Sequence, residues 1–299
     1  MGRKNKVLEP GERRILQIVT HVLVSHFAPT AIIHYSTTVH QHKIRSLFCN
    51  QKPLKERTIY LLLIDDSSTA MDDGIVERMQ DEANNLFDKV HVVIHAHTDE
   101  DVKFKLQERN PYFVQVINEG KVLFSAPSQS PWGKWEVVRS KEYLAKAVSV
   151  WRKQNDLGKG FIDAAEQAIA SDQDRVGLCA LYHACTRFCS GLIWVFMAYD
   201  HPPCKLDKLL RTCGCFSHLP VQHFFGTHDN EQLLNVMINN FNSRDFEQLK
   251  TFGELSTYRF LDLVKSFANI ADGLCKQQFV ELESELQQQG ALQKEVSHG

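Results

Sequence analysis

Apolar residues in the first part of the chain follow two alternating kinds of spacing. Between Glu12 and Phe27 they recur at steps of three and four, which predicts a helix with one apolar face formed by Ile15, Ile18, Val19, Leu23 and Val24. Residues 30–35 and 57–64 are short β-branched or continuous apolar runs, typical of strands that are covered on both faces. A helix over 72–87 and a strand over 90–94 repeat the two patterns. This alternation predicts an α/β domain.

The α/β pattern ends near residue 125. Acidic residues from Asp99 favour a helix start, and Asn110-Pro111 should end that helix. A short apolar segment over 113–118 and an edge strand over 121–124 follow. We therefore place the α/β domain at residues 10–125, and we interpret the turn-forming residues 126–138 as a linker.

Helical periodicity dominates the rest of the chain. The apolar spacing predicts helices over 143–170, 174–199, 205–212 and 231–242, and a long one from 255 onward. Together they predict an all-α helical bundle over residues 139–285. Beyond Phe279 the sequence is rich in Glu and Gln, so we expect the last helix to fray into a flexible tail over 286–299.

The predicted helix 174–199 is apolar around most of its circumference. Leu181, Phe188 and Leu192 form one stripe, while Ile193 and Trp194 extend apolar surface beyond it. Either the bundle buries this helix centrally or a second copy of the chain covers it. We favour a homodimer formed through the helical domain, because a two-fold contact lets one apolar patch cover itself.

Composition is that of an ordinary globular protein, with 43% hydrophobic and 23% charged residues in 299. A net charge of −2 carries no signature of a polyanion-binding protein. The longest apolar run, residues 191–198, is far shorter than the ~20 residues of a membrane helix, and no apolar segment follows the basic N-terminus. We expect a cytoplasmic protein with no membrane span and no signal peptide, whose eight cysteines are reduced.

Two groups of side chains are candidate metal ligands. His95 and His97 share a strand face with His91, and two imidazoles spaced by one residue can hold zinc or copper, although a half-exposed strand end explains them equally well. The second group lacks the paired Cys-x-x-Cys spacing of a zinc site and consists of Cys204, Cys213, Cys215 and His218. We expect no cofactor.

The order of elements over residues 10–125 resembles the minimal nucleotidyltransferase fold, with a mixed sheet. The segment from Tyr112 to Phe124 looks like that family's closing segment, which is an apolar helix, Glu-Gly and an edge strand. Active members carry a Gly-Ser turn after the first strand, two Asp residues one position apart on the second strand, and often a third acid. Those carboxylates hold divalent metal against nucleotide phosphates.

In this chain the resemblance places other residue types at most of these positions. Tyr35 stands where the glycine belongs, and only Ser36 matches the turn. The paired acids are replaced by Thr58 and Tyr60, and His91 stands at the third position. Adjacent carboxylates at 65 and 66 point to opposite sides of an extended chain, so they do not simply replace the pair. We therefore expect no metal-dependent nucleotidyl transfer.

Residues 181–192 and 199–210 resemble the HEPN domain, a helical bundle that often accompanies such transferases and is associated with nucleotide or RNA chemistry. HEPN ribonucleases carry an Arg and a His with four to six residues between them, the Arg suited to phosphate charge and the His to proton transfer. Arg211 and His218 have this spacing within the helical domain, and Arg14 and His21 have it outside, a frequency expected by chance in a chain with 14 histidines. Cys204 replaces the histidine of another pattern of the family.

These observations predict a nucleotide- or RNA-binding regulatory protein of the nucleotidyltransferase–HEPN type, acting in stress or defence. Three alternatives remain open: a HEPN-type ribonuclease that uses Arg211 and His218, a nucleotidyltransferase with unrecognised metal ligands, and a purely structural dimer.

Overall fold

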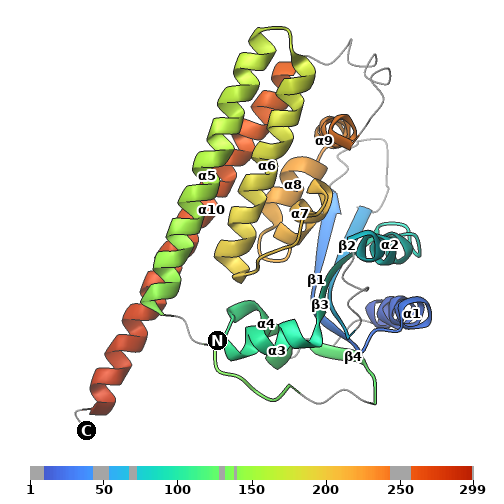
Figure 1. Ribbon diagram of the computed structural model, residues 1–299, viewed down its shortest axis with the longest axis vertical. Helices are drawn as coiled ribbons and strands as arrows, with labels where there is room; N and C mark the ends of the chain where they lie inside the picture. The colour runs from blue at the N-terminus through green and yellow to red at the C-terminus, as the bar shows by residue number, and fades with distance from the viewer. Residues whose placement is uncertain are drawn as a thin grey trace, which may run out of the picture. The chain divides into compact units, whose positions relative to one another are not determined.

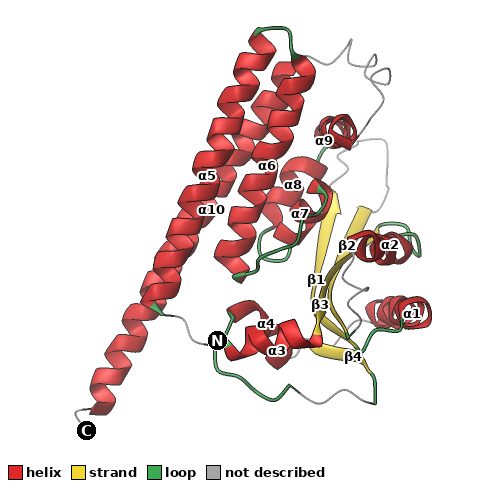
Figure 2. Cartoon of the chain, in the orientation of Figure 1, coloured by secondary structure: helices red, strands yellow, loops and turns green. Residues whose placement is uncertain are grey.

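The computed structural model describes residues 10–42, 54–66, 73–127, 132–137, 140–242 and 257–297. The chain forms two compact units, Met1–Val137 and Val138–Gly299, and their boundary falls within the predicted linker 126–138. The first unit contains a small mixed sheet with helices, and the second is helical (Figures 1 and 2). This agrees with an α/β domain followed by a helical bundle.

In the described part of the first unit, the sheet has four strands in the order β3-β2-β1-β4. These strands are β1 (Ala31–His42), β2 (Leu54–Asp65), β3 (Val90–Thr98) and β4 (Lys121–Ser125). β1 runs antiparallel to both β2 and β4, whereas β2 and β3 are parallel. A parallel pair needs a crossover connection. The helix α2 (Asp73–Asn84) lies within that connection.

Helices cover both faces of the sheet (Figure 1). The first face packs against α1 (Pro10–Phe27) and α2, and its core contains Leu16, Leu23, Ile59, Leu61 and Ile94. On the other side lie α3 (Asp99–Gln107) and α4 (Pro111–Glu119). Because side chains alternate along a strand, residues 58 and 60 of β2 face away from the α1–α2 core.

Local capping fixes the two short helices beside the candidate site. Thr98 caps α3, accepting a hydrogen bond from the Asp101 amide at 3.1 Å. Asn110 caps α4 in the same way, accepting from the amides of Tyr112 and Phe113, and Pro111 occupies the first turn. Asn110-Pro111 therefore ends one helix, as predicted, and also begins the next. The apolar segment 113–118 is accordingly helical.

The first strand differs from its predicted bounds. The prediction ended it at residue 35 and placed Ser36 in a turn, but β1 continues to His42 with a bulge between His34 and Ser36. Residues 36–39 are mostly β-branched and pair with residues 57–60 of β2, which is why the strand continues. The glycine-serine turn that the resemblance implied is thus replaced by bulged strand.

The described residues of the second unit form three long helices and three short ones. The long helices are α5 (Lys141–Ala170), α6 (Asp174–Met197) and α10 (Thr257–Ser297). The short helices are α7 (Leu206–Cys213), α8 (His218–Phe225) and α9 (His228–Asn242). α5, α6 and α10 run side by side (Figure 1). Glycines permit their close contact: a Cβ on Gly158 of α5 would lie 2.5 Å from the Phe188 ring of α6.

Two predictions for this unit were incomplete. The helix α8 was missed because Pro220 interrupts its apolar spacing, yet proline is tolerated in a first turn, and Ser217 caps this helix at the Leu219 amide. The last helix was expected to fray beyond residue 285 but continues to Ser297. Glu and Gln are good helix formers, which accounts for the longer helix.

α6 is central to the second unit and contacts α5, α7, α9 and α10. Ile193 is fully buried and Trp194 is 6% exposed. Burial within one chain accounts for the apolar circumference, so this pattern no longer argues for a homodimer, which stays a prediction. Within the described part of the chain, α6 alone is long and apolar enough to cross a membrane, and 61% of its apolar window is buried inside the protein. That burial is compatible with a soluble protein.

Candidate functional site

The positions that the nucleotidyltransferase resemblance singles out lie close together on the sheet. Ser36 of β1 pairs with Tyr60 of β2, and Thr58 of β2 pairs with His91 of β3. Thr58 and Tyr60 are buried, with 2% and 0% exposure. His91 is partly exposed, and its Nε2 lies 3.9 Å from Glu56 Oε2. The pairing thus unites the four predicted residues, but it supplies no carboxylate pair at positions 58 and 60.

Aromatic side chains fill the sheet face around Tyr60. Tyr35, at the bulge, and Tyr112, from α4, place their hydroxyls 3.0 and 2.8 Å from His95 Nδ1. The Tyr35 ring lies 6.0 Å from that of Tyr60, whose hydroxyl is 3.3 Å from Thr38 Oγ1. We call Tyr35, Tyr60, His95 and Tyr112 the tyrosine–histidine cluster. It is a packed core with internal hydrogen bonds, located where the resemblance would place nucleotide phosphates.

The histidines on β3 that were predicted as metal ligands form hydrogen bonds with other side chains. His95 belongs to the tyrosine–histidine cluster, and His97 Nδ1 lies 2.5 Å from Asp101 Oδ2. The hydrogen bond from His97 is the main cause that lowers the pKa of the Asp101 carboxyl. No group of three or more His, Cys, Asp or Glu side chains is arranged to hold a metal ion anywhere in the described ranges. The second candidate set includes Cys213, which is a buried free thiol.

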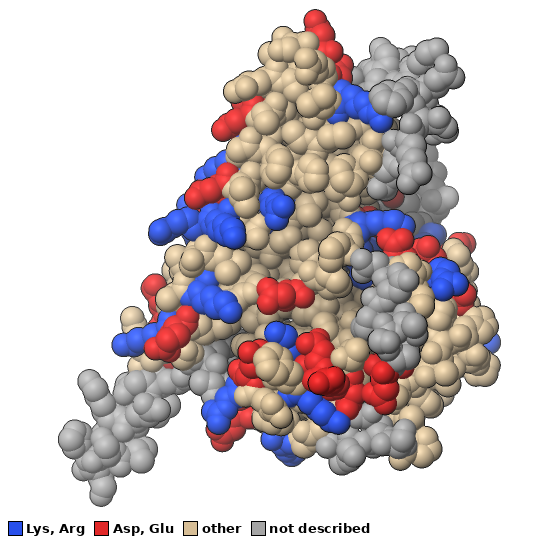
Figure 3. All heavy atoms as spheres, viewed as in Figure 1, with Lys and Arg blue, Asp and Glu red and all other residues tan. Residues whose placement is uncertain are grey.

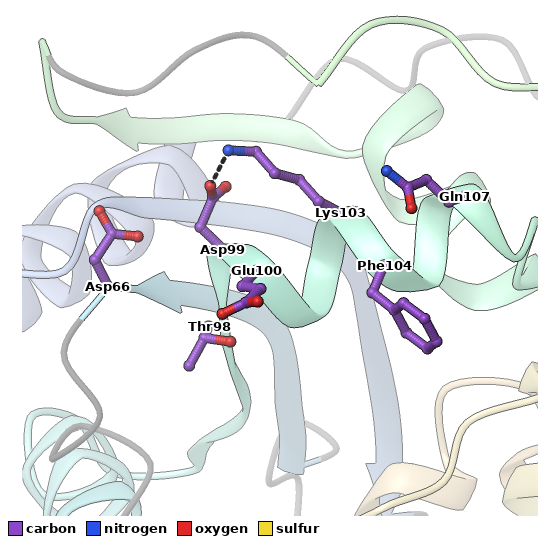
Figure 4. Close-up of a pocket in the computed structure, with 7 residues that line it drawn as sticks. All are labelled: Asp66, Thr98, Asp99, Glu100, Lys103, Phe104 and Gln107. Carbon is purple, nitrogen blue, oxygen red and sulfur yellow. Dashed lines mark ion pairs between the residues drawn. The ribbon is translucent and has the colours of Figure 1, made fainter.

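An acidic pocket of ≈ 650 Å³ lies beyond the carboxyl ends of β2 and β3 (Figure 4). Ligands of open α/β sheets bind at this end of the strands. Carboxylates of Asp66, Asp99 and Glu100 line it, and Lys103 forms an ion pair with Asp99. Phe104 points away from the carboxylates (Figure 4) and is 52% exposed. Acidic side chains gather over α3 in Figure 3 as well. The pocket suits a cation or a hydroxyl-rich ligand better than a phosphate.

The two ribonuclease candidates, Arg211 and His218, are not joined. The Arg211 guanidinium lies 4.4 Å from the Phe225 ring centroid, a cation–π contact between α7 and α8. His218 is the exposed first residue of α8. No hydrogen bond or ring contact links the two side chains in the described structure, so their spacing in the sequence does not produce a shared site.

A polar set that the sequence did not predict lies on α6 and in the segment after it. His183, Arg187 and Ser190 follow one another at helical spacing on α6, and His201 comes after the helix end. The Ser190 hydroxyl lies 2.8 Å from both His201 Nε2 and the Thr186 carbonyl. We call His183, Arg187, Ser190 and His201 the Arg187 cluster. Each of its members is partly buried.

Hydrogen bonding and burial determine the protonation state of this cluster. His201 Nδ1 is 2.9 Å from the Pro202 carbonyl, which can only accept, so Nδ1 carries a proton and Nε2 of the neutral ring can only accept. The Thr186 carbonyl and His201 Nε2 then compete for the one proton of the Ser190 hydroxyl. Burial lowers the pKa of His201, and the positive charges of Lys208 and Arg187 lower it further, although the Pro202 carbonyl and Asp200 oppose this. Burial and Arg187 also lower the pKa of His183.

Arg187 supplies the positive charge of the cluster. Its Nε is buried without a hydrogen-bond partner, and no ion pair to it is formed within the described residues. A buried guanidinium nitrogen that has lost water and gained no acceptor is energetically costly. An anionic oxygen placed there would restore the missing bond and neutralise the charge.

Aromatic rings adjoin the cluster. Phe161 of α5 stacks on His183 at 5.2 Å, and Phe241 of α9 stacks on Tyr182 at 4.0 Å. Phe241 is 39% exposed. The signal for this site was present in the sequence as polar residues at positions 183, 187 and 190. The prediction used the apolar stripe of the same helix and did not consider these polar residues.

Comparison of the chain with family models, curated proteins and solved structures gives no significant match. Both family resemblances therefore stay predictions, and the functional argument is carried by the geometry alone.

Proposed function

We propose that this protein is a cytoplasmic nucleotide- or RNA-binding regulatory protein of the nucleotidyltransferase–HEPN type, without metal-dependent transferase activity. The observation that supports binding is the Arg187 cluster, where a buried guanidinium nitrogen without a hydrogen-bond partner adjoins a serine–histidine pair. The observation that argues against transfer is the tyrosine–histidine cluster, in which Tyr60 stands at one of the positions that the resemblance gives to metal-binding acids and Tyr35 stands at the position of the glycine.

The chemistry of the Arg187 cluster matches a phosphate group. A guanidinium offers a planar fork of donors that suits phosphate oxygens, and the Ser190 hydroxyl can turn from the Thr186 carbonyl toward a ligand. The rings of His183 and Phe241 lie 5.1 Å apart at right angles and offer faces on which a base can stack. Phosphate contact together with stacking favours a nucleotide or single-stranded RNA as ligand.

Single-stranded RNA is expected to bind with an affinity that depends on Arg187. Fluorescence anisotropy with a fluorescein-labelled RNA, with AMP and ATP as competitors, should show a loss of about tenfold for Arg187→Ala, because a charge-assisted hydrogen bond contributes about 1.5–3 kcal/mol. Arg152→Ala is the matched control, since Arg152 is exposed on α5. Equal affinities of the wild type and Arg187→Ala would refute binding at this cluster.

RNA affinity should also rise as pH falls from 7.5 to 5.5. The lowered pKa values of His183 and His201 keep both rings neutral at pH 7.5, and a bound phosphate favours their protonation. The free protein should become less stable over the same interval, because below the ordinary value of 6.5 the unfolded chain binds more protons than the folded one. Anisotropy and urea unfolding at each pH measure the two opposite trends. His201→Gln should reduce both slopes, and unchanged slopes would contradict the assignment.

Metal-independent RNA cleavage is a second candidate function, and the Ser190–His201 geometry favours it. His201 has its Nδ1 proton held by a carbonyl and its Nε2 free to accept a proton, as a general base requires. A nuclease of this kind would use Arg187 and His201 in place of Arg211 and His218. Incubating labelled RNA with the protein in EDTA tests this function. Cleavage is supported if the wild type produces fragments and both Arg187→Ala and His201→Ala produce none. RNA that stays intact with the wild type would contradict cleavage and would leave binding as the one proposed function.

A further inference from the structure

A second pocket of ≈ 560 Å³ lies between α1 and the strand β4. Much of its lining is apolar, with Leu16 and Val24 from α1 and Val122, Leu123 and Phe124 from β4. We call it the α1–β4 groove. Val122 is 52% exposed, which is high for a valine that belongs to a sheet. The groove therefore leaves apolar surface uncovered beside the sheet.

The backbone of β4 is also open to pairing. β4 is the last strand in the order β3-β2-β1-β4, and among the strands that the structure describes it pairs with β1 alone. None of the backbone hydrogen bonds formed by the described residues engages its outer edge. An exposed edge presents unpaired N–H and C=O groups, which an extended segment can use to add a strand. Only Lys121 places a charge on this strand.

The polar groups at the groove indicate the charge of what it binds. Arg13, His21 and Lys121 line it together with no acidic side chain, and none of the three forms an ion pair in the described part of the chain. Thr20, in the middle of the same lining, has a buried hydroxyl without a hydrogen-bond partner. A carboxylate or backbone carbonyl of a ligand would satisfy that hydroxyl and face the cationic rim.

We propose that the α1–β4 groove binds an extended segment of a partner protein, in which apolar and acidic residues alternate, as an added strand beside β4. Alternation follows from the pleat, because every second residue of the added strand faces α1 and its apolar contacts, while the residues between them remain at the rim. A second copy of the chain fits less well, since pairing two β4 edges would bring two cationic rims together.

A charge-swap experiment on the full chain tests this. The probe is a short fluorescein-labelled peptide of alternating valine and glutamate, with a valine–lysine peptide as its counterpart. The wild type should prefer the valine–glutamate peptide. Arg13→Glu/Lys121→Glu should lose about tenfold in affinity for it, as two charge contacts are reversed, and should gain affinity for the valine–lysine peptide.

Two controls separate this mode from general charge attraction. Arg152→Glu/Lys159→Glu reverses two exposed cations on α5 and should leave the preference unchanged. A valine–glutamate peptide with alternate backbone nitrogens methylated should bind more weakly, because it cannot donate strand hydrogen bonds. Equal binding of the two peptides by the wild type, or an equal effect of the α5 variant, would overturn the proposal. So would a dimer of this chain that the groove variant dissociates in sedimentation velocity.

Discussion

Replacing Phe188 with alanine is expected to destabilise the helical unit by about 3–5 kcal/mol, the usual cost of removing a buried aromatic ring. Phe188 is fully buried at the centre of α6. Its ring lies against Gly158 of α5 and meets the Phe267 ring of α10 at 6.2 Å. One side chain therefore joins the three long helices, and the glycine beside it has no side chain to fill the cavity.

Urea unfolding followed by circular dichroism measures this effect. Val176→Ala is the matched control on the same helix, because Val176 is 56% exposed and its truncation should cost less than about 0.5 kcal/mol. A loss below 1 kcal/mol for Phe188→Ala would mean that the three helices do not pack around this ring.

Placing two aspartates at positions 58 and 60, where the nucleotidyltransferase resemblance would put the paired acids, is expected to destabilise the first unit without producing activity. The wild type should transfer no nucleotidyl group with Mg²⁺ or Mn²⁺. Thr58→Asp/Tyr60→Asp should remain inactive and lose more than about 3 kcal/mol of stability. Tyr60 is fully buried, so an aspartate in its place would be both too small for the space and charged in a site without water. Adding Tyr35→Gly would remove the ring that packs on Tyr60 and open the space further.

Tyr60→Phe is the conservative control. It keeps the ring and loses the hydroxyl that contacts Thr38, and its cost should be about 1 kcal/mol. Labelling of RNA or protein from α-labelled ATP in the presence of metal, together with urea unfolding, provides the two readouts. Robust metal-dependent labelling by the wild type would show that other residues hold the metal and would overturn the proposed loss of transferase activity.

Much of the architecture could be predicted from the spacing of apolar residues. The buried runs of β2 and β3 and the long periodic segments of α5 and α6 satisfy strong packing requirements, and a sequence records those requirements directly. Bounds set by weaker preferences were harder to predict. β1 continues through polar β-branched residues because β2 offers them partners, and α8 tolerates Pro220 because a first turn does not need that amide.

The candidate sites were predicted less well, for a geometric reason. Strand pairing brought Ser36, Thr58, Tyr60 and His91 together because each lies at a register position of a regular sheet. The Ser190–His201 contact depends on the path of the chain after α6, where Ala198 adopts a left-handed conformation with φ of 53°. No periodic pattern in the sequence predicts that the chain turns back toward Ser190 after α6. The prediction relied instead on the spacing of a short motif and selected Arg211 and His218.

The pairing of β1 with β4 also has a consequence for how the chain acquires its structure. Ala31 pairs with Ser125, so the edge of β1 that binds β4 stays uncovered until all of the intervening chain has been synthesised. Contacts between residues so far apart in sequence slow folding, whereas the hairpin of α5 and α6 assembles from neighbouring segments. During translation the first unit therefore has an interval in which β1 presents an open edge. An unpaired strand edge can join another chain, so this interval exposes the nascent chain to misassembly.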